Sequence, residues 1–145
     1  MRDVLIPTTY AGTGPEFVFP PKAEFNNPIT AIYQYDEVHR FTVATKDGLV
    51  GEQRAGHNDQ QKKMLNPVDC VVQKIQVWHS NCIRGFKFYD HKNNVVLESG
   101  YFTDAMKEVF LEQGERLLQI RSKHYNDGCH KFFHCNLVLV FGKLE

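Results

Sequence analysis

The chain repeats one pattern of apolar positions three times. Each copy begins with apolar residues in a short segment and continues, after a turn, with alternating apolar residues. The copies comprise residues 29–35 with 38–43, residues 72–78 with 83–88, and residues 117–120 with 137–141. Three similar β units in one small chain indicate a threefold all-β body, because each unit alone is too small to bury its apolar face.

Period-two or continuous apolar runs bounded by turn residues predict strands along most of the chain, whereas helical periodicity is nearly absent. The expected strands are 17–19, 29–35, 38–45, 71–78, 83–89, 95–97, 108–111, 117–123 and 132–141. Turns rich in Gly, Asp and Asn are expected at 46–48, 90–94, 112–114 and 126–128. We interpret residues 1–145 as a single β domain.

Two stretches do not fit this strand pattern. Residues 1–15 are predicted to form an irregular N-terminal arm, because glycine and proline interrupt the segment. Residues 51–66 are predicted to form a long polar loop of Gln, Lys, Asn, Asp and His. Within this loop, a short helix over 58–64 is an alternative, with Asn58 as its cap.

Composition limits the classes of function. The 17 basic and 17 acidic residues give a formal net charge of zero, so nothing electrostatic indicates nucleic acid or an anionic membrane as a partner. The first residues carry too few apolar side chains for a signal peptide or a membrane span, so we expect no membrane insertion. The predicted location is the cytoplasm, or a cytoplasmic or organellar assembly. The four cysteines lack a C-x-x-C spacing and are interpreted as reduced thiols.

Residues 72–141 carry a family resemblance. The segments I-Q-V, I-R-G-F-K-F-Y-D and E-V-F-L-E-Q-G-E-R-L-L-Q-I, with the final apolar strand, resemble the jacalin-like (β-prism) domain. The resemblance implies three four-stranded Greek-key sheets packed around a pseudo-threefold axis. The β-trefoil is the alternative, since it also has three units of this length and Gln76-Val77-Trp78 is similar to its Q-x-W signature.

The same resemblance implies where a sugar would bind. Jacalin-like lectins hold a monosaccharide with a G-x-x-x-D loop near the C-terminus and a glycine-rich segment near the start. Here the corresponding turn, residues 125–130, carries Asp and Gly in a different order and spacing. The implied carbohydrate-binding residues are Tyr125, Asn126, Asp127, Gly12 and Gly14, with Tyr125 stacking on the ring. The alternative interpretation of residues 125–130 is an ordinary hairpin turn.

Catalytic and metal-binding chemistry find little support in the sequence. His124, Cys129, His130, His134 and Cys135 are the densest group of candidate metal ligands. On a strand, His130 and His134 would lie about 13 Å apart at roughly 3.3 Å per residue, too far for one ion. Nucleophile elbows, phosphate-binding loops and dinucleotide fingerprints are absent. We therefore predict no catalytic residues, no metal and no cofactor, and do not expect an enzyme.

The main functional hypothesis is a non-catalytic surface-recognition module. Tyr10, Phe25, Tyr101 and Phe102 lie outside the clear strand pattern and are the predicted contacts with another protein, because aromatic residues are enriched at interfaces. The module is predicted to be an accessory or scaffold subunit of a larger protein assembly, with other protein subunits as partners. The alternative is a carbohydrate-binding jacalin-like lectin, with glycans as partners.

Overall fold

The computed structural model describes residues 1–12, 16–35, 40–51, 61–64, 72–126 and 132–143, and within these ranges it contains strands and no helix. No helix in the described part of the chain has the length and apolar character needed to cross a bilayer. The strands are β1 (Arg2–Ile6), β2 (Glu16–Phe19), β3 (Ala31–Tyr35), β4 (Arg40–Thr45), β5 (Gly48–Gly51), β6 (Gln61–Met64), β7 (Val72–His79), β8 (Ile83–Asp90), β9 (Val95–Gly100), β10 (Ala105–Phe110), β11 (Arg116–Asn126) and β12 (Phe132–Gly142).

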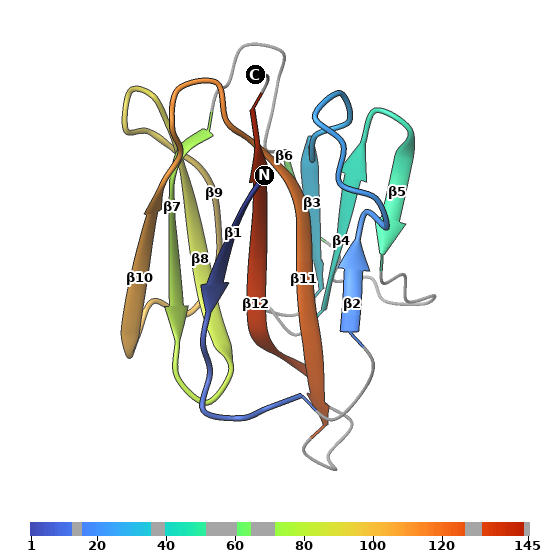
Figure 1. Cartoon of the computed structure of the whole chain (residues 1–145). Coiled ribbons are helices and arrows are strands. Elements are labelled where there is room, and N and C mark those ends of the chain that lie inside the picture. Colours follow the sequence, from blue (N-terminus) through green and yellow to red (C-terminus); the bar gives the residue numbers. More distant parts are fainter. Residues whose placement is uncertain (13–15, 36–39, 52–60, 65–71, 127–131, 144–145) are drawn as a thin grey trace.

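The strands form three antiparallel four-stranded sheets that stand side by side (Figure 1). Their orders are β6-β3-β4-β5, β10-β7-β8-β9 and β2-β11-β12-β1. The first two orders are the Greek-key arrangement, in which the fourth strand returns to lie beside the first. The third sheet has the same arrangement if β11 and β12 are counted before β1 and β2. Both ends of the chain therefore complete one Greek key.

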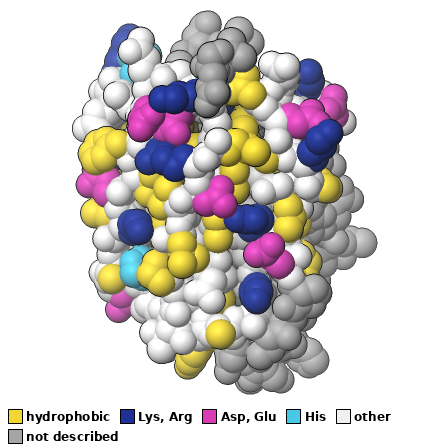
Figure 2. Space-filling view, viewed as in Figure 1, with side chains coloured by type: hydrophobic (Ala, Val, Ile, Leu, Met, Phe, Trp, Pro, Cys, Tyr) yellow, Lys and Arg dark blue, Asp and Glu magenta, His cyan; other side chains and the backbone are white. Residues whose placement is uncertain are grey.

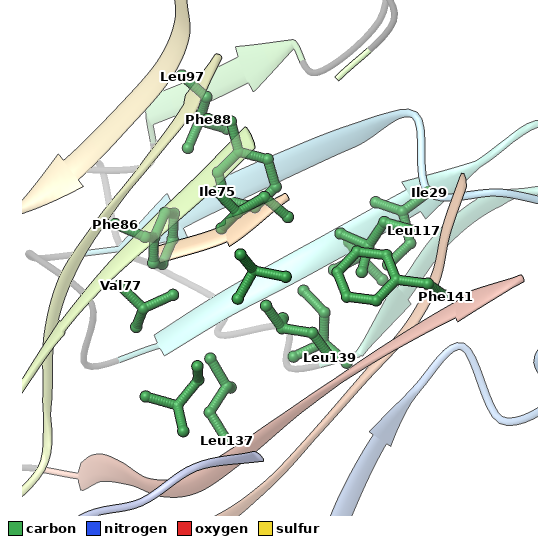
Figure 3. Packing of buried hydrophobic residues seen from close by; sticks show 14 of the residues in the cluster. Ile29, Ile75, Val77, Phe86, Phe88, Leu97, Leu117, Leu137, Leu139 and Phe141 are labelled. Carbon is green, nitrogen blue, oxygen red and sulfur yellow. The ribbon is translucent and has the colours of Figure 1, made fainter. Parts of the chain in front are cut away.

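The core lies where the inner faces of the three sheets meet (Figure 3). On β12, Leu137, Leu139 and Phe141 are buried and alternate with residues of the outer face, as expected for a strand with one face toward the core. The opposing β7 and β8 contribute Ile75, Val77, Phe86 and Phe88, and the sheet of β3 and β4 contributes Val43. Each sheet thus contributes one apolar face to the core, and it could not bury this face without the other two sheets.

The predicted threefold β body is confirmed. The three repeats coincide with the central hairpin of each sheet, namely β3–β4, β7–β8 and β11–β12. The β-trefoil alternative is wrong, because the described strands belong to three separate sheets with one Greek-key order.

The turn expected at 90–94 is also present, between β8 and β9. The Asp90 carboxylate accepts hydrogen bonds from the backbone amides of Lys92 and Asn94 at 2.9 and 2.8 Å. These bonds, led by that of Asn94, hold the pKa of the Asp90 carboxyl below its ordinary value. Asn93 has a left-handed backbone with φ of 65°, a conformation that Asn tolerates better than most residues.

Three strands differ from the sequence-based expectation. Residues 2–6 of the predicted irregular arm form β1, which pairs with β12 from Arg2↔Phe141 to Ile6↔Leu137. Residues 61–64 of the predicted polar loop form β6, an edge strand beside β3, and not the last turn of a helix. Gly48–Gly51 forms β5 at the opposite edge of the same sheet. The remainder of the predicted polar loop, 52–60 and 65–66, lies outside the described residues.

Trp78, the last residue of the Gln76-Val77-Trp78 segment, lies on the outer face of its sheet, opposite Met106. The alternation along β7 directs Ile75 and Val77 inward.

Candidate functional site

One end of the prism gathers segments that are far apart in the sequence. We call it the β7–β8 end, because the turn between these strands lies there, and we call the opposite end the β8–β9 end. The connection that leaves β1 runs along the β7–β8 end toward β11 (Figure 1). Thr9 and Tyr10 donate backbone hydrogen bonds to the carbonyls of Ser80 and Asn81, each at 3.0 Å. The β1–β2 connection is thus fixed to the β7–β8 turn.

Gly12 brings the β1–β2 connection into direct contact with β11. A Cβ atom at Gly12 would lie 2.1 Å from the Cβ of Lys123, and 2.9 and 3.0 Å from its backbone C and Cα. Real Cβ atoms do not approach other atoms so closely, so any larger residue would push the connection away from β11. Glycine is required here for close approach of two backbones.

The residues predicted to bind carbohydrate fall into two groups. Tyr125 and Asn126 are the last residues of β11, paired with Phe133 and Phe132 of β12. Gly12 contacts β11 three residues before Asn126, so the structure brings these three positions to the same end of the prism. Asp127 and Gly14 lie outside the described residues. No sequence pattern indicated that Lys123 lies beside Gly12, or that Ser80 and Asn81 accept hydrogen bonds from Thr9 and Tyr10. The Gly12-x-Gly14 spacing was the available signal.

Two buried cysteines lie close to this end of the prism. Cys82 of the β7–β8 turn and Cys135 of β12 are free cysteines, and burial raises the pKa of both thiols. A thiol with a raised pKa is a poor nucleophile, and both thiols are free, in keeping with the interpretation of the cysteines as reduced. The hydroxyl of Ser122 and the Nδ1 atom of His134, the residue before Cys135, are also buried and lie 2.7 Å apart.

The candidate metal ligands give no described site. Within the described ranges, no group of three or more His, Cys, Asp or Glu side chains is placed to hold an ion. Cys129 and His130 lie outside those ranges. That the chain lacks metals, cofactors and catalysis stays a prediction.

The four predicted protein-contact residues do not form one surface. Tyr10 and Tyr101 lie at the β7–β8 end and are 40% and 49% exposed. Phe102 packs against Trp78 at a centroid distance of 4.8 Å, with the Lys87 ammonium 4.3 Å above its ring. Phe25 lies at the other end of the prism.

The contact of Phe25 with Arg116 assigns it to that end. Arg116 is the first residue of β11, and its guanidinium lies 4.5 Å from the centroid of the Phe25 ring. Arg116 and Asn126 are the two ends of an 11-residue strand, so Phe25 and Tyr10 are separated by the length of the sheet. Partners within the chain cover Phe25 and Phe102 in part, which weakens their assignment to an interface.

Charges of both signs are interspersed over the face shown in Figure 2, and no described patch of one sign dominates it. Among the described charged residues, Arg121 pairs with Asp3 at 2.8 Å and Lys143 pairs with Glu112 at 2.7 Å. This surface agrees with the zero net charge and offers no described footprint for a polyanion.

Comparison with known proteins gives fold relatives only. No family model and no curated protein sequence matches the chain. Among solved structures, artocarpin complexed with Me-α-mannose has a TM-score of 0.66 at 10% identity, covering 99% of both chains. A prostate-specific WGA16 glycoprotein lectin has a TM-score of 0.63 at 11% identity, covering 90% of this chain and 91% of that one. Calsepa lectin in complex with a biantennary N-glycan has a TM-score of 0.59 at 14% identity, covering 99% of both.

These relatives correct one prediction and confirm another. The neighbours that match over their whole length are described as lectins, and none of the three is described as a subunit of a larger assembly. The prediction of an accessory or scaffold subunit is therefore wrong, and the predicted partnership with other protein subunits has no support among these neighbours. The predicted architecture is confirmed: the chain has the jacalin-like β-prism fold.

Proposed function

We propose that the chain is a carbohydrate-binding protein that holds a saccharide at the β7–β8 end of the prism. The observation that carries this proposal is the contact of Gly12 with Lys123. It brings the β1–β2 connection beside the last residues of β11, just before Asp127 in the sequence. A glycine-containing segment near the start and an Asp-containing turn near the C-terminus are the two parts that the jacalin-like resemblance implies for a sugar site.

The residue types at this end suit a neutral, hydroxyl-rich ligand. An Asp carboxylate accepts hydrogen bonds from sugar hydroxyls, and an Asn amide both donates and accepts. Asn126 and Asp127 supply these groups side by side in the sequence, and Tyr125 supplies an aromatic ring for stacking on the apolar face of a sugar. Asp and Gly stand in a different order from G-x-x-x-D, so sugar preference is not carried over from the relatives.

The fold relatives indicate which probes to use first. Artocarpin is described with Me-α-mannose and Calsepa lectin with a biantennary N-glycan. Both ligands are included with a broad glycan array, so that a different preference of this chain would also be detected.

The test compares the wild type with Asp127→Ala on the array and by calorimetry. Loss of the carboxylate's hydrogen bonds is expected to weaken binding about ten- to a hundredfold. Asp47→Ala is the matched control, since Asp47 is an exposed acidic residue in the β4–β5 turn at the opposite end of the prism (Figure 1). A wild type that binds no glycan, or an Asp127→Ala protein that binds as well as the wild type, would contradict the proposal.

A further inference from the structure

A second contact holds the β1–β2 connection, this time against β12. The side-chain Oδ1 of Asn136 accepts a hydrogen bond from the backbone amide of Thr8 at 3.3 Å. In return, the Thr8 hydroxyl oxygen accepts a hydrogen bond from the backbone amide of Asn136 at 3.0 Å. The Thr8 hydroxyl also lies 2.8 Å from the carbonyl of Tyr10, to which it donates. We call this reciprocal pair of hydrogen bonds the Thr8–Asn136 clasp.

The backbone of β12 is distorted at the clasp. Asn136 has a left-handed backbone with φ of 50°, although it lies within a strand. The pairing of β11 with β12 shifts register next to it, between Arg121↔Val138 and Lys123↔Cys135, which is a β-bulge. A left-handed residue other than glycine is disfavoured and persists only where its surroundings stabilise it. The clasp is a contact that stabilises it.

The distortion has a geometric consequence for the connection. It presents the amide and side chain of Asn136 to Thr8, outside the regular β11–β12 ladder. Thr8 precedes Thr9 and Tyr10, which are bonded to the β7–β8 turn, and Gly12, which contacts Lys123. The clasp is therefore the first of three successive attachments along the connection, to β12, to the β7–β8 turn and to β11.

We infer that Asn136 is a positioning residue, which fixes the β1–β2 connection in the conformation that binds saccharide without contacting the saccharide itself. This inference rests on the proposed function. A connection held in its binding conformation before the ligand arrives loses less conformational entropy on binding. Loss of the clasp is therefore expected to weaken glycan binding while the prism stays folded.

The variants separate the side chain of Asn136 from its backbone conformation. Asn136→Gly keeps the left-handed backbone but removes Oδ1, and Asn136→Asp keeps a side-chain oxygen acceptor. The matched control is Asn93→Gly. Asn93 is also left-handed, with φ of 65°, and its Oδ1 accepts a hydrogen bond from Lys74 Nζ at 2.9 Å, but it lies at the β8–β9 end.

The first measurement is hydrogen exchange of the Thr9 and Tyr10 amides, which needs no ligand. Asn136→Gly is expected to speed their exchange about tenfold relative to the wild type, whereas Asn136→Asp and Asn93→Gly leave it within about twofold. Unchanged exchange in Asn136→Gly would overturn the clasp, whether or not the protein binds glycans.

The second measurement is the affinity for Me-α-mannose and for a biantennary N-glycan. Asn136→Gly is expected to bind about tenfold more weakly, and Asn136→Asp and Asn93→Gly as the wild type does. Faster exchange with unchanged affinity would overturn the positioning role. A wild type that binds neither these probes nor any glycan of the array would overturn the proposed function and the positioning role with it, while the exchange data would still decide the clasp.

Discussion

The side chain of Glu115 is buried although it is charged, and its partners explain why. Its two oxygens accept hydrogen bonds from Arg2 Nε and Nη2 at 3.1 and 2.7 Å. Its Oε1 also accepts from the backbone amide of Glu112 at 2.7 Å. Arg2 in turn donates to the Phe110 carbonyl at 3.0 Å and lies over the Phe141 ring. One ion pair thus joins β1 to the β10–β11 turn and to β12.

We predict that Glu115→Ala lowers the free energy of unfolding by about 2 kcal/mol. The substitution leaves the partly buried Arg2 guanidinium without its carboxylate and the Glu112 amide without its acceptor. Asp3→Ala is the control, because the Asp3–Arg121 pair is more exposed and is expected to contribute less than about 1 kcal/mol. Urea denaturation of both variants tests this difference, and equal destabilisation would contradict the role assigned to Glu115.

Central strands and edge strands differed in how well the sequence predicted them. The six central strands carry apolar residues at regular intervals, because one face of each contributes to the shared core. The missed strands β1, β5 and β6 each pair with one neighbour and lie at sheet edges. β6 reads Gln-Lys-Lys-Met, a composition typical of protected edges but not of strands in general, and β5 is bounded by Gly48 and Gly51.

β1 offers a direct test of its assignment as a strand. We predict that Ile6→Ala lowers the free energy of unfolding by about 3 kcal/mol, because Ile6 is fully buried in the core cluster. Leu5→Ala is the adjacent control, since Leu5 is 49% exposed and points to the outer face; its cost is expected to be below about 1 kcal/mol. Similar, small effects in thermal or urea unfolding would indicate a loosely attached arm instead.

At the scale of the whole molecule, strands from the start and from the end of the chain pair in one sheet. This pairing brings together the segments of the proposed site. β1 and β2 come from the start of the chain, whereas β11 and β12 come from its end. Gly12 and Lys123 become neighbours only when this sheet is complete. Sequence patterns revealed the three repeats, because each repeat is local.

The meeting of Gly12 with Lys123, and of Thr8 with Asn136, could not be predicted from the sequence. These contacts depend on the register of β1 against β12 and on a bulge at Asn136, and neither feature leaves a pattern in the apolar positions. The family resemblance supplied Gly12 and the turn after β11 as candidates, but gave no geometry between them.

The most direct test of the account is an NMR titration that follows backbone amide shifts as the strongest-binding array glycan is added. The account predicts that shifts concentrate at Tyr10, Gly12, Asn81 and Lys123 to Asn126, on the β7–β8 end, while residues 91–94 at the β8–β9 end stay unchanged. Shifts confined to the β8–β9 end would show that a saccharide is held elsewhere and would contradict the proposed site.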